Sequence, residues 1–156
     1  MFLHLLNNDQ KTSFFAMASE MLRADDEAHD KEIEYLDQLI REAGLVKKRA
    51  LQDPPPPMDL SAFDTAEAKH TLVLELLILS VIDGDYHVKE AAFANDMIDA
   101  LDIDEDTHEE LCRMTNDAVS LIHRMRDLAE EGKIRPVLLS RAQAIYTRNI
   151  GEDDEE

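Results

Sequence analysis

An apolar run from Leu72 to Ile82, broken only by Glu75 and Ser80, limits the fold of this chain more than any other segment. A membrane span needs about 18–20 apolar residues, so the run is too short to cross a bilayer. It instead predicts a helix that is buried on most of its sides. We expect Glu75 at the one exposed position of this helix; the alternative is a buried acid that faces acidic loops elsewhere in the chain.

Apolar residues in the rest of the chain recur at the three- and four-residue spacing of amphipathic helices, and no segment alternates in the manner of a strand. Glycines follow several of these segments, where a left-handed residue commonly ends a helix. We therefore predict an all-α fold, a single-domain bundle of about six to seven helices. The predicted helices run from about residue 8 to 24, 30 to 43, 61 or 64 to 82, 88 to 101, 104 to 131 and 136 to 150.

The length of 156 residues suits one domain with one continuous core. We predict that residues 1–151 form this helical domain. Four consecutive prolines, Pro54–Pro57, cannot be helical, so residues 46–58 are expected to form an extended crossover between an N-terminal helical pair and a larger C-terminal part. Residues 152–156 are all acidic and are predicted to be a disordered tail.

Acidic residues outnumber basic ones by 35 to 16, which gives a formal net charge of −19. Nucleic-acid binding needs a basic face, so the composition argues against a nucleic-acid partner and favours cations or basic proteins. The single cysteine, Cys112, cannot form an intrachain disulfide. The apolar start, Met1–Leu6, lacks the basic residues and the length of a signal peptide. We expect a cytoplasmic protein without a membrane span.

Two acidic segments, 25–32 and 83–90, align at an offset of 58 residues. They share Asp, His, Lys and Glu at four positions and carry an acid at a fifth. Each segment follows an apolar helix and precedes an amphipathic one, and the alignment continues in phase into that second helix. We interpret the chain as two helix–acidic loop–helix units, at about 14–45 and 72–103, that pack as a pseudo-symmetric pair.

The second unit has a recognisable pattern: an apolar helix is followed by Asp-Gly-acid and then by a Glu at the start of the next helix. The first unit has a looser version of this pattern. The residues that carry the pattern are Asp83, Gly84, Asp85 and Glu90 in the second unit and Asp25, Asp26, Glu27 and Glu32 in the first. The pattern resembles the TerB-like (tellurite-resistance protein B) family of small all-helical domains, over residues of about 14–130. The resemblance implies a helical bundle whose acidic loops have been proposed to bind divalent metal. It also implies a role in bacterial stress or tellurite-linked systems, with no established reaction.

Both acidic segments supply carboxylates and an imidazole at a spacing that suits a metal site. In each of them the His and the following Glu lie three residues apart at a helix start, so they face the same way. Oxygen donors suit Ca²⁺, Mg²⁺ or Mn²⁺, whereas an added imidazole favours Mn²⁺, Fe²⁺ or Zn²⁺. An EF-hand is excluded because the twelfth loop position is Leu36 or Ala94 instead of Glu. The candidate ligands are Asp25, Glu27, His29, Glu32, Asp83, Asp85, His87 and Glu90, with the two histidines, which depart from the TerB-like pattern, as optional members.

The same His-x-x-Glu spacing is that of a capping box, in which Glu32 or Glu90 reaches back to the backbone N–H of residue 29 or 87. Carboxylates in a first turn also stabilise the helix dipole without any ligand. Metal ligation and helix capping are therefore alternatives for these residues. We expect Lys31 and Lys89 to be solvated partners of neighbouring acids.

The charges of the C-terminal half are unevenly distributed. Residues 96–110 carry eight acids and no Lys or Arg, whereas residues 111–149 carry seven basic and four acidic residues. Such asymmetry could orient the protein on a basic partner or in a self-associated pair. We predict a non-enzymatic, divalent-metal-binding stress-response module. The alternative is an acidic protein-interaction module without metal, and the third is a metal-dependent hydrolase.

Overall fold

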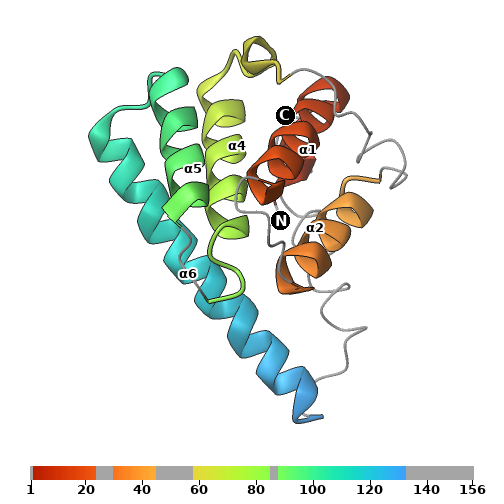
Figure 1. The fold of residues 1–156 in the computed structure, drawn as a ribbon. Coiled ribbons are helices and arrows are strands. Elements are labelled where there is room, and N and C mark those ends of the chain that lie inside the picture. The colour runs from red at the N-terminus through yellow and green to blue at the C-terminus, as the bar shows by residue number, and fades with distance from the viewer. Residues whose placement is uncertain (1, 24–29, 45–57, 85–87, 133–156) are drawn as a thin grey trace, which may run out of the picture. The chain divides into compact units, whose positions relative to one another are not determined.

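A computed structural model describes residues 2–23, 30–44, 58–84 and 88–132 of the chain. Within these ranges every regular element is helical and none is a strand, which confirms the all-α prediction (Figure 1). Single turns of 3₁₀ helix, η1 (Leu3–Leu5) and η2 (Leu60–Ala62), precede two of the α-helices. The α-helices are α1 (Asn8–Arg23), α2 (Asp30–Glu42), α4 (Ala66–Leu79), α5 (Val88–Ala100) and α6 (Glu105–Glu130).

Three predicted features lie wholly or mostly outside the described residues: the helix at 136–150, the acidic tail at 152–156 and the crossover at 46–58, of which only residue 58 is described. The chain divides into two compact units, residues 1–116 and 117–156, with the boundary inside α6. The packing described below belongs to the first unit. None of the helices in the described ranges combines the length and the apolar character that a bilayer crossing requires.

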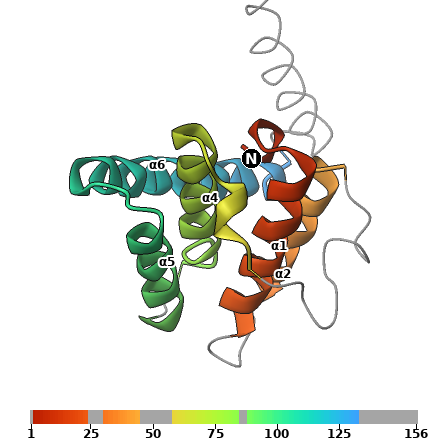
Figure 2. The same ribbon diagram turned by 90° about the horizontal axis from the view of Figure 1, so that it is seen from above.

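Helix α4 is the centre of the first unit. It contacts α1, α2, α5 and η1, and both views place it between α5 and α1 (Figures 1 and 2). This position follows from its sequence, since a helix that is apolar on nearly all sides must be covered on nearly all sides. The prediction of a buried helix in this run is confirmed for residues 72–79, but the predicted end at Ile82 is wrong because α4 ends at Leu79 and residues 80–83 form turns. Its buried residues are Ala68, Thr71, Leu72, Val73, Leu74, Glu75, Leu76, Ile78 and Leu79.

Helix α4 begins later than its sequence predicts. We expected Ser61 or Asp64 to start it, but residues 60–62 form the separate turn η2, and the α-helix begins at Ala66. The reason is local: Thr65 has an extended backbone, and its hydroxyl accepts a hydrogen bond from the Ala68 N–H at 3.2 Å, as an N-cap residue does. In α1, the Asn7 side chain plays the same part.

The bounds of the helices repeat along the chain. Helices α1 and α4 begin 58 positions apart, and α2 and α5 begin and end 58 positions apart, which is also the offset of the two acidic segments. Helix α2 contacts α4, while α5 contacts both α4 and α1. The turn η1 contacts α4 and α2, and η2 contacts α1. The second helix of each pair therefore contacts the first helix of the other pair, and α5 also contacts α4 of its own pair.

The ends of α2 and α5 also correspond. Gly44 and Asp102, 58 positions apart, both follow the last helical turn with a left-handed backbone, at φ values of 67° and 55°. The N–H of Asp102 bonds to the carbonyl of Asp99 at 3.1 Å and the N–H of Ile103 bonds to that of Ile98 at 3.2 Å, the arrangement of a Schellman motif. Asp102 thus occupies a position that favours glycine.

Replacing Asp102 with glycine is expected to raise the free energy of unfolding by about 0.5–1 kcal/mol, because glycine adopts this backbone without steric cost. The change is measured by urea denaturation followed by circular dichroism. Asp102→Asn separates the loss of charge from the change in backbone preference. Gly44→Ala is the opposite test: its new Cβ would meet no atom within 4 Å, so a loss of about 1 kcal/mol would come from the backbone alone. A destabilised Asp102→Gly variant would contradict this account.

Candidate functional site

Only part of the acidic-loop site predicted from the sequence can be placed. Asp25, Glu27, His29, Asp85 and His87 lie outside the described residues. The other three candidate ligands, Glu32, Asp83 and Glu90, are described.

Glu32 and Glu90 lie in the first turns of α2 and α5, and each side chain is 1% exposed. Charged residues are almost never buried to this extent unless they bind a partner group. Both glutamates are engaged in polar or electrostatic interactions within the protein. Glu32 and Glu90 therefore match in position and in burial.

Lys31 connects the two acidic segments. Its ammonium donates a hydrogen bond of 2.8 Å to the backbone carbonyl of Asp83, which follows α4. The start of α2 and the segment after α4 therefore lie side by side. We expected Lys31 to pair with acidic side chains, whereas the contact seen here is to a main-chain oxygen.

The described residues alone do not assemble a metal centre. Within them, no group of three or more His, Cys, Asp or Glu side chains is placed to hold an ion. Glu32, Asp83 and Glu90 also do not line either of the two pockets described below. A hydrolase would need its metal beside a pocket, so these pockets provide no support for that third hypothesis.

Glu75 contradicts the expectation that it occupies an exposed position on its helix, since its exposed fraction is 0%. Its carboxylate accepts a hydrogen bond of 3.1 Å from the Tyr35 hydroxyl and a second one from the backbone N–H of Phe2. Helix α4 is covered by α2 and η1 where the sequence analysis expected solvent. Glu75 is thus a buried acid that joins three elements.

Tyr35 is held in its neutral form by this environment. Burial is the main cause that raises the pKa of its hydroxyl well above the ordinary value of 10, and the adjacent Glu75 carboxylate raises the pKa further. A phenolate next to a buried carboxylate would place two negative charges in contact. The hydroxyl therefore remains a hydrogen-bond donor to Glu75 over the physiological pH range.

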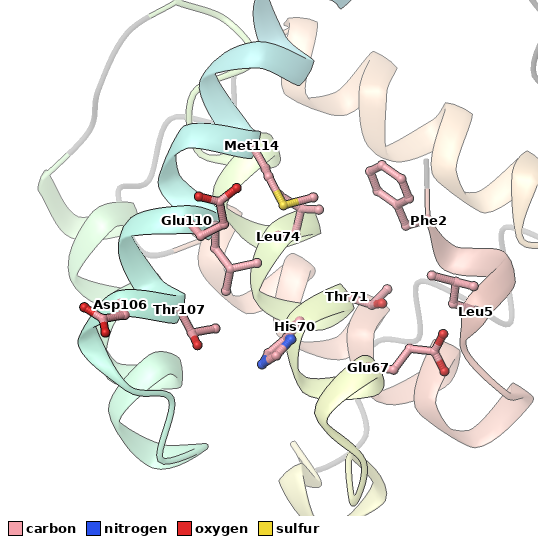
Figure 3. A pocket seen from close by; sticks show the side chains of 11 residues that line it. Phe2, Leu5, Glu67, His70, Thr71, Leu74, Asp106, Thr107, Glu110 and Met114 are labelled. Atoms are coloured by element: carbon pink, nitrogen blue, oxygen red, sulfur yellow. The ribbon is translucent and has the colours of Figure 1, made fainter.

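An apolar groove of about 650 Å³ lies where η1, α4 and the first turns of α6 meet (Figure 3). Phe2 and Leu5 stand on one side of it and Met114 on the other, with Leu74 between them (Figure 3). Leu5 and Met114 are 38% and 41% exposed, so both side chains are partly open to solvent at the groove. The eleven lining residues are Phe2, Leu5, Glu67, His70, Thr71, Leu74, Asp106, Thr107, Glu110, Leu111 and Met114.

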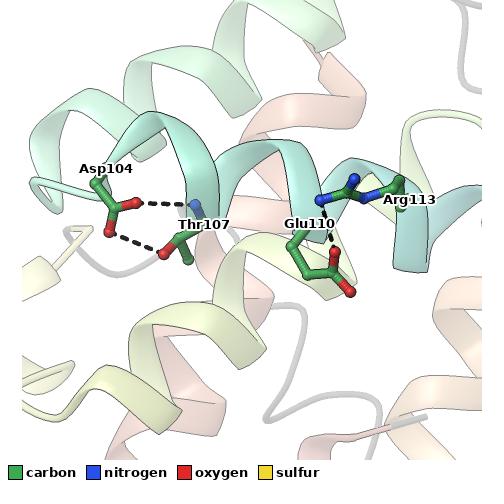
Figure 4. Close-up of polar contacts among 4 residues, drawn as sticks. All are labelled: Asp104, Thr107, Glu110 and Arg113. Carbon is green, nitrogen blue, oxygen red and sulfur yellow. Dashed lines mark hydrogen bonds and ion pairs between the residues drawn. The ribbon is translucent and has the colours of Figure 1, made fainter.

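The α6 side of the groove is set by how that helix begins. Asp104 caps it, accepting hydrogen bonds of 2.9 and 2.8 Å from the backbone and the hydroxyl of Thr107 (Figure 4). These two bonds are the main cause that lowers the pKa of Asp104. One turn later, Glu110 forms an ion pair of 2.8 Å with Arg113 (Figure 4). Both partners are largely exposed, so the pair contributes little to stability.

Cys112 lies beside a smaller pocket of about 260 Å³ that His108, Glu109 and Arg113 also line. Partial burial is the larger cause that raises the pKa of its thiol, and Glu109 raises it further. A thiol is a nucleophile only as its thiolate, so these surroundings disfavour reactivity.

Sequence reasoning missed the groove. Asp106 and Glu110 belong to the acid-rich stretch 96–110, and this stretch was the one signal that pointed toward it. The apolar interior of the groove could not be predicted from the sequence, because Phe2, Leu74 and Met114 come from three segments far apart in the chain. Comparison of the chain with models of protein families, with curated protein sequences and with solved structures found no match. The resemblance to the TerB-like family therefore stays a prediction based on the acidic motifs.

Proposed function

We propose that this chain is a non-enzymatic helical module in which the two acidic loops bind a divalent cation, and that it serves a stress response as its resemblance to the TerB-like family implies. The observation that carries the proposal is the matched placement of Glu32 and Glu90. They lie 58 positions apart in the first turns of helices of equal length, and both are buried.

The crossed packing supports a pseudo-symmetric pair of helix–loop–helix units. In such a pair, each helix that follows an acidic loop packs on the first helix of the other unit, as α2 does on α4 and α5 does on α1. The contact of Lys31 with the Asp83 carbonyl favours a shared location for the two loops. A cation there would neutralise facing carboxylates and stabilise one arrangement of the two units.

The donor chemistry fits a hard cation. Carboxylate oxygens are the ligands that Ca²⁺ and Mg²⁺ prefer, and the optional histidines, His29 and His87, would shift the preference toward Mn²⁺ or Zn²⁺. Helix capping explains the burial of Glu32 and Glu90 equally well, because a capping box also turns the Glu side chain back onto its own helix start. An experiment must therefore separate ligation from capping.

Thermal unfolding after chelator treatment, with Ca²⁺, Mg²⁺, Mn²⁺ and Zn²⁺ added singly, is the test. At about 100 times the dissociation constant a bound ion adds about 2.7 kcal/mol, which raises the melting temperature by about 5 °C or more. We expect one ion to give this shift, and Asp83→Asn combined with Glu90→Gln to abolish it.

The matched control is Asp96→Asn combined with Glu105→Gln, which makes the same chemical changes at exposed positions outside the acidic loops. It should keep the full ion-dependent shift. Asp83→Asn alone, with binding measured by titration calorimetry on folded protein, covers the case in which the Glu90 change impairs folding. If no ion gives a specific shift, or if both double variants respond like the parent, the cation proposal is wrong and the loops are helix caps.

A further inference from the structure

The groove between η1, α4 and α6 has an apolar interior. Leu74 and Leu111 are each 4% exposed, and Phe2, Leu5 and Met114 surround them. A volume of about 650 Å³ is within the range of pockets that bury a ligand or several side chains. Contact between large apolar groups and water is unfavourable. A partner that covers such groups at a concave surface therefore gains binding free energy.

The edge of the groove carries one sign of charge. Glu67 in the first turn of α4 and Asp106 and Glu110 on α6 line it, and none of the lining residues is Lys or Arg. Arg113 forms an exposed ion pair with Glu110, and the imidazole of His70 also lines the groove. An acidic edge around an apolar interior attracts a cationic amphiphile and repels an anionic one.

We propose that this groove binds an amphipathic helix of a partner protein, with Leu-like side chains in the groove and Lys or Arg beside Glu67, Asp106 and Glu110. A helix is favoured over an extended peptide because the groove walls are helices, and the described residues contain no strand edge to which a peptide strand could add. The charge of the partner follows from the acidic edge and from the net charge of −19.

The buried carboxylate of Glu75 contributes to this site without lining it. It accepts a hydrogen bond from the backbone N–H of Phe2, the residue just before η1, and so ties the start of η1, which carries Leu5, to α4. One wall of the groove is thereby held in place before any partner binds. A preformed groove lowers the ordering cost of binding.

Fluorescence anisotropy with a labelled peptide of about 18 residues, built from Leu and Lys with Leu at helical spacing, tests the proposal. Chelator is present throughout, so the result does not depend on the cation proposal. We expect saturable binding that weakens as NaCl rises from about 50 to 500 mM. Leu5→Ala combined with Met114→Ala is expected to weaken binding at least tenfold, whereas Leu121→Ala, at an exposed position outside the groove, should change it less than twofold.

A second pair of variants tests the charges. Glu67→Gln with Asp106→Asn should weaken binding several-fold and reduce its salt dependence, while the control Asp96→Asn with Glu105→Gln, of equal net charge, should do neither. Melting temperatures establish that each variant is folded. The proposal is overturned if a scrambled Leu/Lys peptide binds as well as the amphipathic one, or if the groove variants bind like the parent. It is also overturned if sedimentation shows a dimer that Met114→Ala dissociates, since a second copy would then be the occupant.

Discussion

Replacing Glu75 with alanine is expected to lower the free energy of unfolding by about 3–5 kcal/mol, which is a large share of the stability of a small protein. Two effects add together. The change opens a cavity in the covered face of α4, and it leaves the Tyr35 hydroxyl and the Phe2 N–H without the acceptor they now use. Urea denaturation of both proteins measures the difference.

Glu75→Gln is the matched control for this prediction. Glutamine has the same shape and keeps one acceptor oxygen, so it should cost much less than alanine. The double variant with Tyr35→Phe measures the coupling directly, and we expect about 1.5–3 kcal/mol for a hydrogen bond to a charged group. An alanine variant within 1 kcal/mol of the parent would mean that the carboxylate contributes little to the fold.

The stability of the protein is expected to fall at alkaline pH through Tyr35. In the unfolded chain a tyrosine loses its proton near pH 10, whereas burial and Glu75 keep the folded pKa of Tyr35 well above that value. Above pH 10 the unfolded state therefore binds fewer protons than the folded state, and the free energy of unfolding decreases. The slope reaches up to about 1.4 kcal/mol per pH unit, while well below pH 10 the titration of this group adds no pH dependence to the stability.

Tyr35→Phe isolates this contribution from the other tyrosines. At neutral pH the variant should be less stable than the parent, because it lacks the hydrogen bond to Glu75. The parent then loses stability above pH 10 faster than the variant, so the two curves converge. Denaturation midpoints collected from about pH 8 to 12 provide the comparison, and a constant difference over that range would refute the assignment.

The helix bounds were the part of the fold best predicted from the sequence. The predicted segments at 30–43 and 88–101 differ by only one residue at their ends from α2 and α5. These bounds depend on local features, namely apolar spacing, capping side chains and left-handed residues such as Gly44. The start of α4 was missed because Asp59 and Thr65 each cap a separate element, whereas a single helix start was predicted there.

The candidate sites were predicted less well. Glu32 and Glu90 were identified from their spacing, but whether they ligate a cation stays a prediction. Glu75 was assigned to solvent because a single acid in an apolar helix most often marks the exposed side. Its burial depends on Tyr35, which lies 40 residues away on a helix whose packing partner no periodicity reveals.

By itself, the sequence determined that the described part of the chain is helical, where most of its helices begin and end, and that two acidic segments recur at an offset of 58 residues. These properties depend on interactions between residues a few positions apart, so the order of residues in the sequence is enough to predict them. Only the tertiary structure decided that α2 packs on α4, that Glu75 is buried, and that Phe2, Leu74 and Met114 form one groove with an acidic edge. Those outcomes depend on which surfaces meet when separate helices bury their apolar faces together, and helical periodicity marks such faces without specifying their partners.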